Sequence, residues 1–163
     1  MDEKLPIQKI TTFLSFQNQA EEAVRYYTSI FKNSKVLRTL RWGDVGPGPK
    51  GSVLTIAFEL EGQQLVAMNG GPHFTFTDGI SLSVDCKSQA EVDEMWEKLS
   101  AGGERRDCGW VRDKFGVSWQ VVPTVMLEML HDPDPVKAGR AMAAMMTMQK
   151  LDIAKLTHAY EGG

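Results

Sequence analysis

The feature that most constrains the fold of this chain is an internal repeat. The segment Asn18-Gln-Ala-Glu21 precedes one amphipathic stretch, and Ser88-Gln-Ala-Glu91 precedes another. An Asn or Ser followed three residues later by Glu is the pattern of a helix that begins with a capping box. A short run rich in β-branched and aromatic residues lies before each segment. Two copies of one strand–helix unit predict two sister modules in one chain.

Each module is expected to contain a strand, a helix and three further strands. Hydrophobic alternation and turn residues predict the first module's strands at about 10–16, 35–42, 52–61 and 63–69. The same signals predict the second module's strands at 80–86, 104–107, 109–112 and 117–122, of which the polar segment 104–107 is the weakest. The prediction is an α+β fold: two βαβββ modules, at about 7–69 and 79–123, forming a curved mixed sheet around a cleft.

The C-terminal segment has no counterpart in the first module. It is predicted to form a helical tail over about 125–160, with one helix starting near Pro135 and a last one ending near Tyr160. Met142, Met145 and Met146 recur at helical spacing, which favours a role in the core or in a subunit contact. At 163 residues, modules and tail together are expected to form a single domain.

Composition excludes several classes of function. A formal net charge of −3 offers no attraction to nucleic acid or to an anionic membrane surface. No apolar run approaches the roughly 20 residues needed to span a bilayer, and residues 1–6 lack the apolar region of a secretory signal. Two cysteines in a chain of this size need no disulfide. These observations predict a cytoplasmic protein.

Several motifs resemble one known family. The relevant segments are 10–16 (ITTFLSF), 19–23 (QAEEA), 70–72 (GGP), 80–84 (ISLSV), 108–123 (CGWVRDKFGVSWQVVP) and, in the tail, 141–156. They resemble the PhnB-like group, also labelled demethylubiquinone methyltransferase-like, of the vicinal oxygen chelate superfamily. The resemblance implies paired βαβββ modules whose eight strands curve around a cleft, and a homodimer. It implies no single reaction, because members of the superfamily catalyse different reactions or only bind their ligands.

The metal site of metal-dependent members has no match in this sequence. Such members hold a divalent ion with His or carboxylate side chains on the opening and closing strands of both modules. The opening-strand positions fall near Lys9 or Thr11 and near Gly79 or Ser81, and the closing-strand positions fall at Val66 and Gln120. None of these residues is His, Asp or Glu. We therefore expect no metal and no cofactor.

The expected partner is a small organic molecule bound between the modules. Six residues are candidates for binding it: Phe13, Asn69, His73, Trp110, Trp119 and Gln120. The aromatic residues suit a flat ligand, and core packing is the alternative for each of them. Trp119 and Gln120 are adjacent on one strand and so point to opposite faces. The resemblance to the superfamily implies that Gln120 points inward. His73 is the one histidine expected near the cleft, although a loop histidine with a local hydrogen bond is the favoured interpretation.

No catalytic residue can be named from the sequence. Cys108 lies close to three arginines, yet free cysteine is commonly a core residue. Four functions stay open: a metal-free binding protein, which we favour, a metal-dependent enzyme of the glyoxalase or dioxygenase type, a structural or interaction domain with a filled cleft, and a methyltransferase. The last is disfavoured because no glycine-rich turn connects a buried strand to a helix, as cofactor-dependent methyl transfer usually requires.

Overall fold

The computed structural model describes residues 8–163 of the chain. It divides into two compact units, the first ending at Phe76 and the second spanning Thr77–Gly163. The expected start of the first module at residue 7, and the segment 1–6, lie outside the described residues. Each unit contains one of the two predicted modules, so the α+β fold with tandem modules is confirmed.

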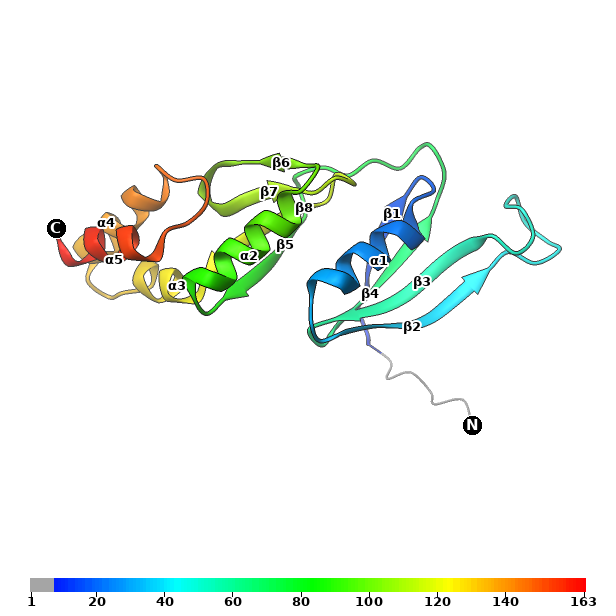
Figure 1. Ribbon diagram of the computed structural model, residues 1–163, viewed down its shortest axis with the longest axis horizontal. Coiled ribbons are helices and arrows are strands. Elements are labelled where there is room, and N and C mark those ends of the chain that lie inside the picture. Colours follow the sequence, from blue (N-terminus) through cyan, green and yellow to red (C-terminus); the bar gives the residue numbers. More distant parts are fainter. Residues whose placement is uncertain (1–7) are drawn as a thin grey trace. The chain divides into compact units, whose positions relative to one another are not determined.

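The elements follow the predicted order (Figure 1). Those of the first unit are β1 (Thr12–Phe16), α1 (Ala20–Ile30), β2 (Ser34–Arg41), β3 (Val53–Leu60) and β4 (Gln63–Asn69). Those of the second module are β5 (Ser81–Cys86), α2 (Gln89–Ser100), β6 (Glu104–Arg105), the 3₁₀ turn η1 (Asp107–Gly109), β7 (Trp110–Arg112) and β8 (Ser118–Pro123). The tail contains α3 (Thr124–Leu130), α4 (Pro135–Met145) and α5 (Ile153–Glu161).

The two sheets have the same topology, which is the structural form of the repeat. Their strand orders are β1-β4-β3-β2 and β5-β8-β7-β6. In each sheet the first strand pairs in parallel with the last, and the other pairs are antiparallel. The strands thus form two separate four-stranded mixed sheets rather than one continuous sheet.

In the first sheet, alternate residues face a helix. Leu14, Ala67 and Ile56 lie side by side in the sheet register and are buried. α1 covers this face and packs against β3 and β4 (Figure 1), with Tyr27 stacked on Phe58 at a ring-centroid distance of 6.4 Å. Side chains alternate along a strand, so the next register row lies on the opposite face. That row includes Phe13, which is 54% exposed.

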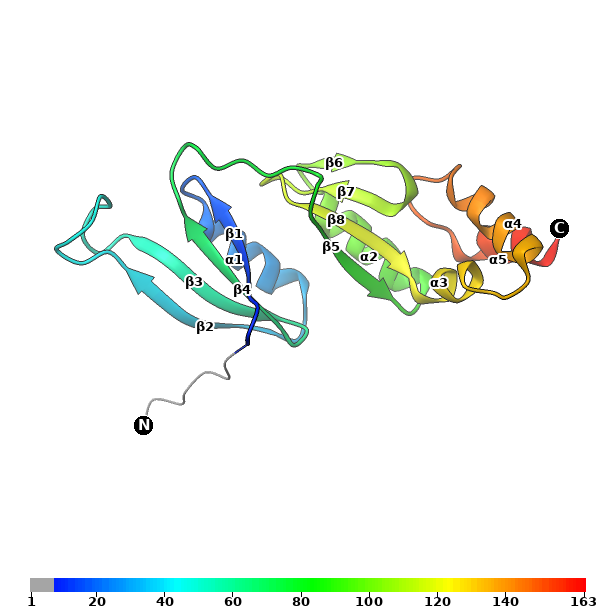
Figure 2. The same ribbon diagram turned by 180° about the vertical axis from the view of Figure 1, so that it is seen from behind.

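The second sheet repeats this division into a covered and an open face. Val111 and Trp119 are register partners and are buried on the side of α2. The indole Nε1 of Trp119 donates to the buried carboxylate of Asp113 at 2.9 Å. Figure 2 shows the second sheet from the side opposite to α2. Trp110 and Gln120 pair in register on this open face, and both are half-buried.

The capping box predicted for α2 is confirmed. The Ser88 Oγ accepts from the backbone N–H of Glu91 at 3.2 Å. The Glu91 carboxylate accepts from the backbone N–H of Lys87 at 2.7 Å. A backbone donor of the first helical turn and the donor just before the N-cap are thus bonded by side chains close to them in sequence.

The corresponding prediction for α1 is wrong. The N-cap position of α1 is Gln19, and no side chain at this position caps the helix. The Ala20 N–H instead donates to the Oδ1 of Asn69, at the end of β4, at 2.9 Å. The Asn69 Nδ2 donates in turn to the Val53 carbonyl at 3.2 Å. A residue distant in sequence therefore takes the role expected of Asn18, and it links α1 to β3.

The tail helices pack around a core that also includes Val122 of β8. Its buried residues are Val122, Met126, Met129, Ala141, Leu151 and Leu156. Met145 at the end of α4 packs against this core, whereas Met142 on α4 and Met146 just after it are 42% and 66% exposed. Arg140 donates to the carbonyl of Tyr160 at 2.7 Å, which holds α5 against α4.

We predict that Asn69→Ala lowers the free energy of unfolding by about 1–2 kcal/mol, because the variant leaves a helix-start N–H without its acceptor. Urea unfolding monitored by circular dichroism measures the change. Asn18→Ala is the matched control and should change stability by less than about 0.5 kcal/mol, since Asn18 is exposed and caps nothing. The opposite ranking of the two variants would show that the local cap forms after all.

Candidate functional site

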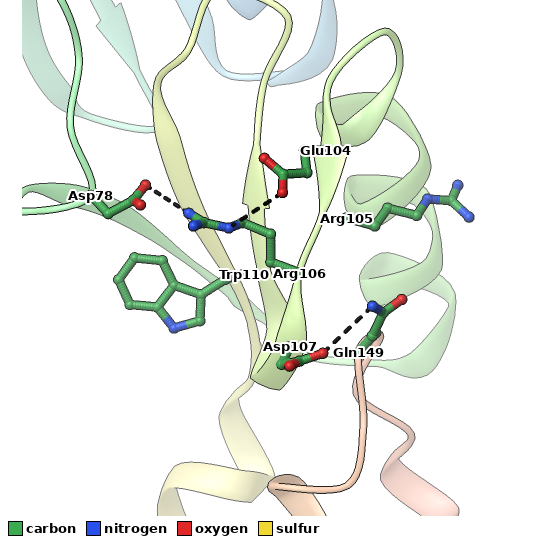
Figure 3. A pocket seen from close by; sticks show the side chains of 7 residues that line it. All are labelled: Asp78, Glu104, Arg105, Arg106, Asp107, Trp110 and Gln149. Atoms are coloured by element: carbon green, nitrogen blue, oxygen red, sulfur yellow. Dashed lines mark hydrogen bonds and ion pairs between the residues drawn. The ribbon is translucent and has the colours of Figure 1, made fainter.

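The second unit contains a pocket of about 540 Å³ at the edge of its sheet (Figure 3). Five sequence segments contribute to it: the residues before β5, strand β6, turn η1, strand β7 and the loop between α4 and α5. Its lining residues are Asp78, Glu104, Arg105, Arg106, Asp107, Trp110 and Gln149. Five of the seven are ionisable, and one is a large aromatic residue.

Two consecutive arginines, the last residue of the short edge strand β6 and the residue after it, have different partners. Arg105 bonds to Glu97 on α2 at 2.6 Å and to the hydroxyl of Ser100 at 3.1 Å. Arg106 extends to the other side of the strand, toward Asp78 (Figure 3). The polar sequence that made this strand the weakest prediction is therefore the sequence of a pocket wall.

Asp78 connects three segments of the second unit. Its carboxylate accepts from Arg106 Nη1 at 2.7 Å, from Arg112 Nη2 at 3.1 Å and from the Ser118 hydroxyl at 2.7 Å. Arg112 lies on β7 and Ser118 on β8, so one side chain joins the start of the unit to its sheet. Glu104 adds weaker ion pairs to the same arginines, at 3.9 Å to Arg106 and 3.5 Å to Arg112.

These contacts shift the ionisation of the residues involved. The hydrogen bond from Arg106, followed by those from Ser118 and Arg112, lowers the pKa of Asp78 well below its ordinary value of 3.8. The same bond raises the pKa of Arg106. Both groups are charged at neutral pH, and this side of the pocket is an internally compensated ion cluster.

The turn η1 is joined to the tail by backbone hydrogen bonds. The N–H of Cys108 donates to the carbonyl of Met148 at 2.8 Å, and the N–H of Gly109 donates to that of Gln149 at 2.8 Å. Gly109 has φ of +83°, and a Cβ there would lie 2.8 Å from the carbonyl oxygen of Val121. Only glycine fits this position without displacement of backbone. The tail thereby places the Gln149 side chain beside Asp107, with Nε2 3.5 Å from Oδ1 (Figure 3).

Of the six ligand-binding candidates, Trp110 is the one that lines this pocket. Gln120 is its register neighbour, and its Nε2 donates to the Ser81 hydroxyl at 2.9 Å. Trp119 is buried in the core on the side of α2. The sequence did not single out Asp78, Arg106, Asp107 or Gln149 as site residues.

The remaining three candidates lie in the first unit. Phe13 is on the exposed face of its sheet, and His73 is exposed in the segment between β4 and the end of the unit. Both polar atoms of the Asn69 side chain are engaged, Oδ1 with the N–H of Ala20 at the start of α1 and Nδ2 with the carbonyl of Val53. Their part in binding stays a prediction.

Other chemically active side chains are dispersed. His131 follows α3, and its Nδ1 lies 2.7 Å from the Leu127 carbonyl, while His158 is exposed on α5. Burial raises the pKa of the Cys86 thiol to about 12, so it is protonated at neutral pH. Cys108 is half-buried with φ of +59°. Within residues 8–163, no three His, Cys, Asp or Glu side chains could together hold a metal ion.

Comparison with known proteins identifies relatives. Residues 8–122 match the model of the family described as 3-demethylubiquinone-9 3-methyltransferase. The PhnB protein from Bacillus cereus is 38% identical, with 72% of this chain covering 100% of that protein at a TM-score of 0.66. The family model ends before α3, so the resemblance expected for residues 141–156 lies outside it. No curated protein matches this chain significantly.

More distant structures share the fold alone. Protein PA1353 from Pseudomonas aeruginosa is 22% identical, with 72% of this chain covering 98% of that protein at a TM-score of 0.60. The fosfomycin resistance protein FosX from Listeria monocytogenes is 16% identical, with 80% of this chain covering 98% of that protein at a TM-score of 0.55. Among the described residues, no helix is both long and apolar enough to cross a membrane.

We predict that Asp78→Asn destabilises the second unit at neutral pH and has progressively less effect in acid. A carboxylate with a lowered pKa stabilises the folded state fully above its ordinary pKa of 3.8, and loses that contribution as the pH falls toward its folded value. The difference in urea midpoint between wild type and variant should therefore narrow below about pH 4. Asp85→Asn, at an exposed carboxylate on β5, controls for the change in net charge. A difference in urea midpoint between wild type and Asp78→Asn that did not change with pH would contradict the ion cluster.

Proposed function

We propose that this chain, which belongs to the 3-demethylubiquinone-9 3-methyltransferase family of the vicinal oxygen chelate superfamily, binds a small organic molecule without a metal ion. The observation that carries the proposal is the pocket beside Trp110. Its volume of about 540 Å³ lies within the range of roughly 300–1,000 Å³ that small-molecule sites occupy. A half-buried indole supplies an apolar face, and the charged rim supplies polar contacts that orient a ligand.

Binding without a metal is supported by the donor residues themselves. The closing-strand position of the second module is Gln120, a neutral amide whose nitrogen already donates to Ser81. The corresponding position of the first module is Val66, which pairs with Phe13 in the register. Neither residue is the His or carboxylate that a divalent ion of this kind requires. The acidic residues of the pocket are engaged with arginine, except for Asp107, whose hydrogen-bond partner is Gln149.

The family description does not by itself assign methyl transfer to this protein. Cofactor-dependent methyltransferases usually have a doubly wound parallel sheet with a glycine-rich turn at a helix start. Here each sheet has one parallel pair of strands. The glycine-rich segment 46–51 connects β2 to β3, and not a strand to a helix. A binding role agrees better with these features.

We predict that 2-naphthol, a neutral planar probe, shifts the indole N–H resonance of Trp110 in a ¹H–¹⁵N correlation spectrum. In titrations followed by the fluorescence of 2-naphthol itself, which the variant also allows, Trp110→Ala should weaken binding by about tenfold, because it removes the aromatic wall of the pocket. Trp42→Ala is the matched control, since Trp42 is a half-buried tryptophan of the first unit, and it should leave the affinity unchanged. Equal affinities of wild type and Trp110→Ala for 2-naphthol would contradict the proposed site.

We further predict that protein purified without chelators carries no stoichiometric transition metal, and that added Mn²⁺, Zn²⁺ or Ni²⁺ leaves the affinity for 2-naphthol unchanged. The physical reason is the lack of His and carboxylate ligands at the closing-strand positions. Elemental analysis by mass spectrometry measures the metal content. Titration with 2-naphthol, with and without each added metal ion, measures the affinity. One metal ion per chain would favour the metal-dependent enzyme instead.

A further inference from the structure

We infer that the pocket beside Trp110 selects an organic cation, such as a protonated or quaternary amine, whose charge is balanced by the Asp107 carboxylate. This inference rests on the proposed function and specifies the chemical class of its ligand. It follows from the balance of charge among the described residues that form the pocket.

The first group of charges is neutral overall. Asp78 and Glu104 are two carboxylates, and Arg106 and Arg112 are two guanidinium groups bonded to them. Each arginine contacts both acids, so the four side chains compensate one another. An incoming anion would have to displace a protein carboxylate from these arginines, and the shortest of those contacts is 2.7 Å.

The second group is neutral as well. Arg105 lines the pocket, but its guanidinium bonds to Glu97 at 2.6 Å and to the Ser100 hydroxyl at 3.1 Å on the side of α2. Its charge is thus satisfied away from the ion cluster of Asp78. Neither arginine of the pocket wall is available as a strong site for an acidic ligand.

Asp107 is the one charged residue of the lining that these ion pairs do not compensate. Across residues 8–163 it has no ion-pair partner, and the Gln149 amide, a neutral group, is its side-chain contact at 3.5 Å. Asp107 is exposed, so its carboxylate is hydrated until a ligand arrives. A cation is the complement of a carboxylate that no protein cation neutralises.

Trp110 supplies a second attraction for the same kind of ligand. The indole lines the pocket three residues after Asp107, and its ring presents a negative face. Tryptophan is the strongest aromatic partner for an organic cation, with roughly 0.5–2 kcal/mol per contact. The lining therefore contains both a carboxylate and an indole, and each favours a positive head group over a neutral group of the same shape.

A matched set of three probes tests the charge preference. Choline, 3,3-dimethyl-1-butanol and 3,3-dimethylbutanoate have head groups of similar shape and are positive, neutral and negative, respectively. Titrations followed at the Trp110 indole resonance give the three dissociation constants. We expect choline to bind about tenfold more tightly than the alcohol, and the alcohol more tightly than the carboxylate.

Two charge-neutralising variants identify the residue responsible. Asp107→Asn should abolish the advantage of choline over the alcohol while leaving the affinity for the alcohol unchanged. Asp85→Asn changes net charge equally at a site on β5, outside the lining, and should preserve the advantage. A shared loss in both variants would assign the preference to overall charge and overturn the role of Asp107.

The outcomes separate this inference from the proposed function. If 2-naphthol binds as predicted but choline has no advantage over its neutral isostere, or the carboxylate binds best, the pocket stands and the cation preference is wrong. If choline gives no shift of the Trp110 resonance at millimolar concentrations, the inference is likewise overturned. If 2-naphthol fails together with all three probes, the proposed binding function fails too.

Discussion

The second unit depends on one carboxylate that three segments share. Asp78 accepts hydrogen bonds from Arg106, Arg112 and Ser118, and so fixes the start of this unit against strands β7 and β8 and the residue that follows β6. The same contacts occupy the arginines that would otherwise make the pocket an anion site. Charge compensation within the wall therefore leaves Asp107, outside the cluster, as the uncompensated charge among the described residues of the lining.

The fold was largely predictable because its signals are local and occur twice. Ser88 and Glu91 are close in sequence, and they form the cap that their spacing indicates. The cap of α1 was not predictable in this way. Its acceptor is Asn69, which reaches the helix start only because β4 lies beside β1 in the folded sheet. Local patterns identify elements, whereas contacts between distant segments depend on the register of strands.

The candidate site was predictable only in part. Trp110 was singled out as an aromatic residue on a strand, and it lines the pocket. Asp107 and Gln149 lie far apart in sequence and meet because the tail runs back to η1. Their signal was indirect: a polar segment at 104–107 where a sheet strand would ordinarily be apolar. Such a departure from the strand pattern indicates that this segment has a role outside the hydrophobic core. It does not indicate that Gln149 of the tail lies beside it.

The attachment of the tail to η1 has a consequence for how this pocket can diversify. The bonds from Cys108 and Gly109 end on the main-chain oxygens of Met148 and Gln149, so they form whatever side chains those two positions carry. The backbone structure of this wall therefore does not depend on which side chains the wall carries. A lineage could exchange residue 149 for an acid, a base or an apolar group, and thereby acquire a new ligand while retaining the same architecture.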